Sequence, residues 1–414
     1  MSEETLDEAG RIPDDLRDDP WLGANPFEPE HKIHPWPALK RLRQIAPVHR
    51  NPLGNWRLSR YADCVHLLRD VNCGVRHVDG RTPNQARGVD AGPGNFMLQQ
   101  DPPNHTRLRK IVGKAFTPRT TERMRPHVES IVAELLDRAA DRRELEVISE
   151  LALAVPSTVI CEMMGIPLAD RVLFTAWTSD TTHLLAASSL TPEKLEQCAA
   201  SATKLADYCA ALIGERGRSL GDDLVSTLIR AHDDGSRLSS EELLAQTVGL
   251  LVAGFETTIG LIGNGVRQLL LHPGELERLR AEPRLIETAV EECLRYDGPI
   301  AVTLRVLHED ARFGGVEVPV DSVVFVEILG ANRDPEIYPD PERFDISRDP
   351  NPHLGFGGGT HQCLGMHLAR METQVAIGGL VSRMREIELV SDEVVMGTSL
   401  FRVLAELPIR VEPK

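Results

Sequence analysis

The chain has 414 residues, of which 42% are hydrophobic and 26% charged, and its 46 Lys plus Arg against 62 Asp plus Glu give a net charge of -16. This balance is typical of a soluble globular protein with a sizeable core, and it excludes a mainly disordered chain. The acidic excess argues against nucleic acid or an anionic membrane as the main partner.

The cysteines and the first residues indicate the compartment. The seven cysteines are odd in number and form no CxxC pair, which is typical of a reducing cytoplasm. They are Cys64, Cys73, Cys161, Cys198, Cys209, Cys293 and Cys363. The start, MSEETLDEAGRIPDDL, is acidic and polar, so we expect no signal peptide and no membrane anchor.

In chain order, the predicted elements begin with a strand-like region at 46–60 and a helix at 61–70. Residues 73–100 are rich in Gly, Pro and polar residues and predict a long binding loop. Residues 106–294 are mostly helical by their apolar spacing. Strand signals at 311–328 and 403–413 flank a glycine-rich loop and a helix at 366–384. We therefore predict a mainly α protein with small β-sheets, as a single domain over 1–414 with a flexible segment at 1–20.

The glycine-rich loop, FGGGTHQCLG, contains Cys363. Its glycines allow the backbone to approach closely, and the helix that starts after Gly365 favours negative charge nearby. These conditions favour a thiolate, which can act as the axial ligand of heme iron. Two alternatives remain open: Cys363 is a small buried hydrophobic residue, or it binds zinc together with His353, His361 and His367, which lack the paired spacing of structural zinc sites.

The segment 247–271 is apolar over most of its length but contains Glu256, Asn264 and Arg267, so we predict a buried helix and not a membrane span. At its centre lies AGFETT, residues 253–258. Gly254 permits close approach, and Thr257 is expected to bond back to a carbonyl and distort the helix. Glu256 and Thr257 together suit binding and protonation of a small ligand; the alternative is a core helix with a satisfied threonine.

Two further motifs lie on predicted helices. Glu292 and Arg295, three residues apart, are close enough to pair. His105 and Arg109, one turn apart, suit a pair of carboxylates or one phosphate. On the opposite face, Arg107, Lys110 and Lys114 form a basic stripe, which is either a docking surface for an acidic partner or a solvated face.

Taken in order, HTRLR, AGFETT, ECLR, ANRDP with PERF, and FGGGTHQCLG with LAR closely resemble the cytochrome P-450 superfamily of heme-thiolate monooxygenases, of the soluble bacterial type. The resemblance runs from about residue 20 to the end. It implies a triangular helical prism that encloses heme b. It also implies that Cys363 ligates the iron beside Phe356. The other residues it places at the heme are His105, Arg109, Arg305, His361, Gly365, Ala253 and Gly254.

The resemblance assigns further roles. Glu256 and Thr257 are the acid-alcohol pair that delivers protons, and Glu292, Arg295 and Arg343 form a structural cluster. By analogy the substrate contacts an apolar set: Phe96, Met97, Leu250, Ala253, Ile300, Ala301, Val302, Leu400 and Phe401. This set favours a hydrophobic ligand such as a terpenoid, steroid, fatty acid or polyketide.

The implied reaction uses O2 and two electrons to insert one oxygen atom, typically into a C-H bond. No flavin, NAD or iron-sulfur motif accompanies these motifs, so an external ferredoxin and ferredoxin reductase driven by NAD(P)H are implied. A peroxygenase would carry an arginine-proline pair in place of Glu256-Thr257. The alternative from another class, a non-catalytic heme sensor or carrier, has no need of that pair.

Overall fold

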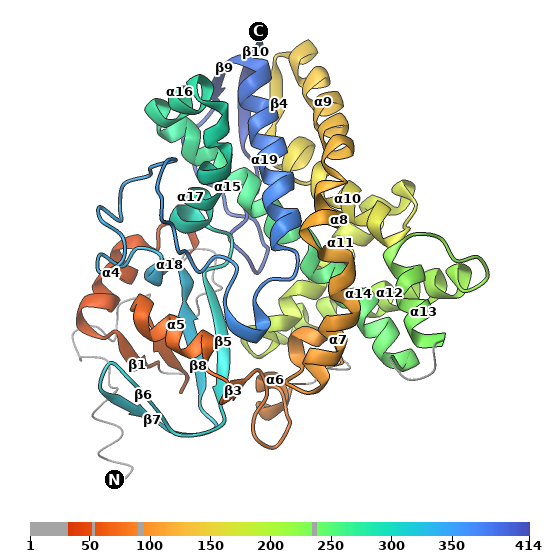
Figure 1. The fold of residues 1–414 in the computed structure, drawn as a ribbon, viewed down its shortest axis with the longest axis vertical. Coiled ribbons are helices and arrows are strands. Elements are labelled where there is room, and N and C mark those ends of the chain that lie inside the picture. The colour runs from red at the N-terminus through yellow and green to blue at the C-terminus, as the bar shows by residue number, and fades with distance from the viewer. Residues whose placement is uncertain (1–31, 52–53, 90–94, 234–237) are drawn as a thin grey trace.

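The computed structural model describes residues 32–51, 54–89, 95–233 and 238–414. Helices form the larger part of the molecule, with strands gathered at the lower left and at the top near the C-terminus (Figure 1). The predicted flexible segment at 1–20 lies outside the described residues. The helices are α4 (Trp36–Ile45), α5 (Tyr61–Arg69), α6 (Pro83–Ala86), α7 (Asn104–Val112), α8 (Pro118–Glu122), α9 (Arg125–Arg142), α10 (Ala154–Met164), α11 (Arg171–Thr182), α12 (Pro192–Arg216), α13 (Leu224–Asp233), α14 (Ser240–Gly254), α15 (Glu256–Leu271), α16 (Pro273–Ala281), α17 (Ile286–Asp297), α18 (Ile328–Ala331) and α19 (Met366–Arg383).

The strands are short and form three small sheets. They are β1 (Val48–Arg50), β2 (Trp56–Leu58), β3 (Cys73–Gly74), β4 (Glu144–Glu146), β5 (Val302–Leu307), β6 (Ala311–Phe313), β7 (Val316–Val318), β8 (Val323–Glu327), β9 (Met384–Leu389) and β10 (Pro408–Pro413). The sheets have the orders β1-β2-β8-β5-β3, β4-β10-β9 and β6-β7, and only the β2-β8 pairing is parallel. The predicted fold class, mainly α with small sheets, is confirmed.

The core is built around α15. Every residue from Thr258 to Val266 is buried, and the helix packs against α17 and α19. Three small residues, Gly260, Gly263 and Gly265, let neighbours approach closely; a Cβ on Gly263 would lie 2.4 Å from the Ile148 side chain. The buried helix thus fixes where its first turn, at Glu256 and Thr257, stands in the molecule.

The predicted single helix over 247–271 is wrong in one detail. The helix is interrupted at Phe255, which has φ -132° and ψ -31°, between α14 and α15. Its ring is buried and makes an edge contact with Phe174 at a centroid distance of 5.8 Å. The expected back-bond of Thr257 does not cause the break, since no residue of the described chain hydrogen bonds to its hydroxyl. Gly254, a weak helix former, and the anchored Phe255 ring account for it better.

Two helical stretches are long and apolar enough to cross a membrane by length and composition, Val147–Met164 and Ser240–Leu271. Most residues of both stretches are buried inside the molecule. Their apolar character is therefore explained by the core they form.

Candidate functional site

The Cys363 loop is held by its own backbone. The N-H of Cys363 donates to the Phe356 carbonyl at 2.9 Å, and the N-H of Gly357 donates to Leu354 at 2.8 Å. Gly357 and Gly359 have φ of +66° and +67°, a region that favours glycine. A Cβ on Gly359 would lie only 2.0 Å from the carbonyl oxygen of Leu68 in α5. Glycine is therefore required at 359 on two grounds.

Cys363 differs from the other cysteines in its accessibility. It is exposed, whereas five others are buried and Cys73 is intermediate. Although solvent reaches it, the thiol lies deep in the molecule, and this burial raises the pKa of Cys363. The N-H of Gly365 and the charges of Arg109 and Arg370 oppose that shift in part. The loop alone therefore does not make the predicted thiolate; a coordinated metal cation would supply the missing stabilisation.

Four donor side chains gather at this loop from separate elements. His105 and Arg109 come from α7, Arg305 from β5 and His361 from the loop itself. The His105 and His361 rings lie 4.1 Å apart between centroids. Arg109 donates to the Gln362 carbonyl at 2.6 Å, and Arg305 donates to the Gly358 carbonyl at 3.4 Å. The structure thus brings all four predicted anion-binding residues together.

This donor cluster carries more positive charge and N-H capacity than its surroundings satisfy. Burial, aided by His361 and Arg109, lowers the pKa of His105 to about 4. Burial also lowers the pKa of Arg109 and of Arg305. The nearby carboxylate, Asp101, lies 3.8 Å from His361 Nε2, too far for a hydrogen bond, and that buried nitrogen has no hydrogen-bond partner in the described chain. Such a cluster suits a ligand that brings two carboxylates.

The junction of α14 and α15 borders accessible space. Ala253 is exposed and Gly254 half-buried, although the residues of α14 just before them are buried. Thr257 is also half-buried. Exposure in the middle of a core helix requires space beside it, and a side chain at Gly254 would have room except toward Ile160. A small ligand can therefore reach the backbone at this point.

Glu256 faces another way. It is only 4% exposed, and its Oε1 accepts a hydrogen bond from Ser179 of α11 at 3.0 Å, while its Oε2 has no partner among the described residues. Burial raises the pKa of Glu256, and neighbouring hydroxyls oppose this in part. Adjacent helical residues do not face each other, and no direct hydrogen bond joins Glu256 to Thr257. Ser179 was missed from the sequence because no local motif marks it.

The predicted structural cluster is present, with one correction. Glu292 and Arg295 are fully buried and form a bidentate pair at 2.7 and 2.8 Å. Arg343 contributes only its carbonyl, which accepts from Arg295 at 3.0 Å; its own side chain is 61% exposed and lies 3.8 Å from Asp345. The second guanidinium at Glu292 belongs to Arg348, at 3.4 Å. The assignment of the Arg343 side chain to the cluster is therefore wrong.

The predicted substrate residues fall into separate groups. Phe96 and Met97 are anchored on α14 beside Leu250: Gln246 accepts from Met97 N at 3.2 Å, and Phe96 covers Gly249. The turn that carries Leu400 and Phe401 is tied to the segment before Val302 by a bond from Arg402 N to the Pro299 carbonyl at 2.9 Å. Ile300 and Ala301, in contrast, pack in part against other apolar clusters.

The basic stripe is only partly free. Arg107 forms an ion pair with Glu242 at the start of α14, which offsets its charge. Lys110 and Lys114 are exposed.

The zinc alternative for Cys363 is not supported. The described residues contain no group of three or more His, Cys, Asp or Glu that could hold a metal ion, and His353 pairs with Glu291 at 3.0 Å.

Comparisons with known proteins agree with this geometry. The family model for cytochrome P450 matches residues 78–404. The chain is 41% identical over 386 residues to cytochrome P450 107B1 of Saccharopolyspora erythraea, covering 89% of this chain and 93% of that protein. The chain belongs to the cytochrome P450 family. It is therefore a heme b enzyme with monooxygenase activity.

Two further relatives are informative. Vitamin D(3) 25-hydroxylase of Pseudonocardia autotrophica is 39% identical over 390 residues, covering 92% of this chain and 94% of that protein. The crystal structure of P450BioI in complex with an acyl carrier protein ligated to hexadec-9Z-enoic acid superposes with a TM-score of 0.86 at 36% identity, covering 92% of this chain and all of that one. The predicted P450 fold is thus confirmed.

The residues present fit heme b. Its two propionates match a cluster of four donors in which the buried His361 Nε2 has no hydrogen-bond partner in the described chain. Its iron needs one protein ligand, and Cys363 is an accessible thiol within that cluster. When bound, heme supplies electron uptake and oxygen activation, while the protein positions, desolvates and delivers protons.

Proposed function

We propose that this P450 inserts one oxygen atom from O2 into a C-H bond of a hydrophobic small molecule, a terpenoid, steroid, fatty acid or polyketide, using two electrons from an external ferredoxin and its reductase. Cys363 is the axial ligand, and His105, Arg109, Arg305 and His361 hold the propionates. One observation carries this assignment: an accessible thiol lies beside four donor side chains from three elements, and the buried His361 Nε2 among them has no hydrogen-bond partner in the described chain.

Two observations support a hydrophobic substrate. The residues expected around it are apolar, and Phe96 and Met97 contact α14, the helix that carries Leu250. The names of two relatives give vitamin D3 as a substrate and a carrier-bound sixteen-carbon acyl chain as a ligand. The protein acts as a soluble cytoplasmic enzyme, in line with its bacterial relatives and its buried apolar helices.

Thr257 and Glu256 have different roles in proton delivery. The hydroxyl of Thr257 is half-buried beside accessible space and free to donate to a ligand there. Glu256, whose pKa burial raises, holds a proton to higher pH than an ordinary carboxyl and faces Ser179. Because no direct bond joins the two residues, a water molecule has to pass the proton between them.

The assignment of Cys363 is tested by the spectrum of the dithionite-reduced protein with carbon monoxide. We expect the strongly red-shifted Soret band of thiolate ligation, and in Cys363→His a band at the position typical of histidine ligation. A wild-type protein that shows the histidine-type band when freshly prepared would contradict the assignment.

The role of Thr257 is tested by coupling. In Thr257→Ala, we expect NADPH and O2 consumption to continue while peroxide release rises and product per NADPH falls about tenfold or more, since a positioned proton donor contributes about 10²–10⁴-fold. Thr258→Ala is the matched control, because Thr258 is the next residue and is buried away from the space. Full coupling in Thr257→Ala would contradict the proposed role.

A further inference from the structure

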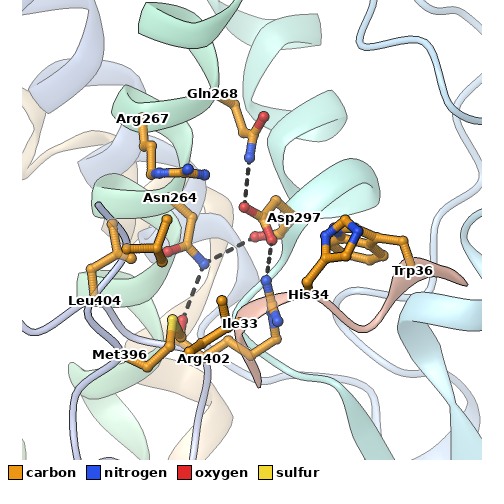
Figure 2. A pocket seen from close by; sticks show the side chains of 11 residues that line it. Ile33, His34, Trp36, Asn264, Arg267, Gln268, Asp297, Met396, Arg402 and Leu404 are labelled. Atoms are coloured by element: carbon orange, nitrogen blue, oxygen red, sulfur yellow. Dashed lines mark hydrogen bonds and ion pairs between the residues drawn. The ribbon is translucent and has the colours of Figure 1, made fainter. Parts of the chain in front are cut away.

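A cavity of about 290 Å³ lies away from the Cys363 loop (Figure 2). None of the residues gathered around Cys363 lines it. Its walls come from the chain before α4 and the first residue of α4, from α15, from the end of α17 and from the C-terminal turns. The lining residues are Ile33, His34, Trp36, Asn264, Arg267, Gln268, Asp297, Val394, Met396, Arg402 and Leu404. We call it the Arg267 pocket. Its volume is near the lower end of the range of about 300–1,000 Å³ for small-molecule sites.

One side of the Arg267 pocket is a fixed polar network. Arg402 pairs with Asp297 at 2.6 Å, and Gln268 donates to the same carboxylate at 2.7 Å. Asn264 donates to the carbonyls of Asp297 and Arg402, both at 3.1 Å. Asp297 is thus already engaged, and the network holds α15, α17 and the C-terminal turn in register.

Arg267 stands outside that network. It is half-buried, and it makes no hydrogen bond or ion pair with any part of the chain that the structure describes. Figure 2 shows its guanidinium turned toward the side on which Asp297 lies, with no interaction drawn to it. Arg402 is only 4% exposed and its buried Nε likewise has no partner among the described residues. Donors without a protein partner in a cavity are available to an acceptor on a ligand.

The charged residues that line the Arg267 pocket favour a ligand with a single negative charge. Two guanidinium groups, Arg267 and Arg402, face one carboxylate, Asp297, so the pocket carries one positive charge in excess. A single carboxylate balances that excess and matches the fork of an arginine. A phosphate dianion would leave a net negative charge in a partly buried space, at a cost in free energy.

Much of the remaining lining of the Arg267 pocket is apolar. Ile33, Val394, Met396 and Leu404 line it together with the ring of Trp36. A ligand that fills it must therefore carry hydrocarbon or an aromatic ring beside its charged end. An inorganic anion would leave this surface without a partner.

We propose that the Arg267 pocket is a second ligand site of this enzyme, which binds a small hydrophobic monocarboxylate. The carboxylate pairs with Arg267, and the apolar part lies against Trp36, Met396 and Leu404. The site is separate from the heme site and does not depend on the identity of the oxidised substrate.

The test uses benzoate as the probe and the holoenzyme with its heme site blocked. Saturating 4-phenylimidazole, bound to the iron, prevents benzoate from entering there, and calorimetry then measures benzoate binding to the remaining site. We expect saturable one-to-one binding in the wild type, at least tenfold weaker binding in Arg267→Gln, and at least tenfold weaker binding of neutral benzamide to the wild type.

Two variants keep the test specific. Arg284→Gln makes the same chemical change at a side chain that is 85% exposed, and should bind benzoate like the wild type. Arg267→Lys keeps the charge but loses the fork, and should fall between the wild type and Arg267→Gln. The proposal is overturned if the azole-blocked enzyme shows no saturable binding, if Arg267→Gln binds as tightly as Arg284→Gln, or if benzamide binds as well as benzoate.

Discussion

The two sides of the proposed heme site differ in how firmly their backbone is held. On the Cys363 side, the loop is fixed by backbone hydrogen bonds, and its Gly359 leaves no room for a side chain against Leu68. At the α14–α15 junction, the helix is broken, the Thr257 hydroxyl has no hydrogen bond within the described chain, and Glu256 Oε2 has no partner there.

This difference follows from what each side has to do. A ligand and four anchoring donors must stand at set positions before the cofactor binds, so the fold holds them through rigid elements. Groups that pass protons must exchange partners, and unsatisfied atoms leave them free to do so. The fold therefore leaves proton-handling groups without partners at Glu256 and Thr257, whereas it bonds the backbone of the Cys363 loop.

The largest effect on stability is expected at the buried Glu292–Arg295 pair, on the Cys363 side of the site. Arg295→Ala would leave Glu292 buried without its bidentate partner, so we expect a loss of about 3–5 kcal/mol in the free energy of unfolding, measured by urea titration. Arg348→Ala should cost about 1–3 kcal/mol. Arg343→Ala, at an exposed side chain, should change stability by less than about 0.5 kcal/mol. An Arg343→Ala loss as large as that of Arg295→Ala would restore the original assignment.

Substitution of single glycines tests how rigid the Cys363 loop is. Gly357 and Gly359 have nearly equal positive φ, but only Gly359 meets a backbone oxygen at 2.0 Å. Gly357→Ala should therefore cost about 1–2 kcal/mol for its backbone conformation alone. Gly359→Ala should cost about 3 kcal/mol and also lower the heme content of purified protein, because Leu68 or the loop must move. Equal losses in the two variants would show that the loop yields easily and would weaken the contrast with the α14–α15 junction.

The sequence predicted what depends on local spacing and failed where distant residues meet. His105 and Arg109 were placed correctly because their separation of four residues fixes them on one helical face. The break at Phe255 depends on an aromatic contact with Phe174, eighty-one positions away, which no local pattern reveals. The same holds for Ser179 at Glu256, for Arg107 at Glu242, and for the choice of Arg348 over Arg343.

Glu372 in α19 is an under-bonded acid on the Cys363 side, in addition to the under-bonded His361 of the loop. It is fully buried, its Oε2 has no partner in the described chain, and burial raises the pKa of its carboxyl to about 8 from an ordinary 4.5. Between pH 4.5 and 8 the unfolded chain has lost this proton while the folded protein keeps it, so stability falls as pH rises.

We expect Glu372 to contribute a fall of about 1.4 kcal/mol per pH unit, or about 2.7 kcal/mol between pH 5.5 and 7.5. Glu372→Gln has no charge to lose, so the difference in unfolding free energy between variant and wild type should shift by that amount across the two pH values. A difference that does not change with pH would mean that Glu372 has an ordinary pKa and a hydrogen-bond partner in solution.

The smallest effect is expected on the outer face of α7, the helix whose inner face carries His105 and Arg109. Arg107 is engaged by Glu242, so the proposed docking surface for an acidic ferredoxin consists of Lys110 and Lys114. Reversing both charges, in Lys110→Glu/Lys114→Glu, should slow reduction by a [2Fe–2S] ferredoxin several-fold at low salt, because rim charges act mainly on association rate. The difference in reduction rate between variant and wild type should shrink as salt rises, because at 0.1 M salt exposed charges more than about 10 Å apart are largely screened from each other. Lys40→Glu/Lys204→Glu makes the same change in net charge at two exposed lysines outside α7 and should leave the rate near that of the wild type. If both double variants slow reduction equally, the total charge of the protein steers ferredoxin, and the outer face of α7 is only a solvated face. If only the α7 variant slows reduction, one helix anchors the propionates on its inner face and receives the electron donor on its outer face.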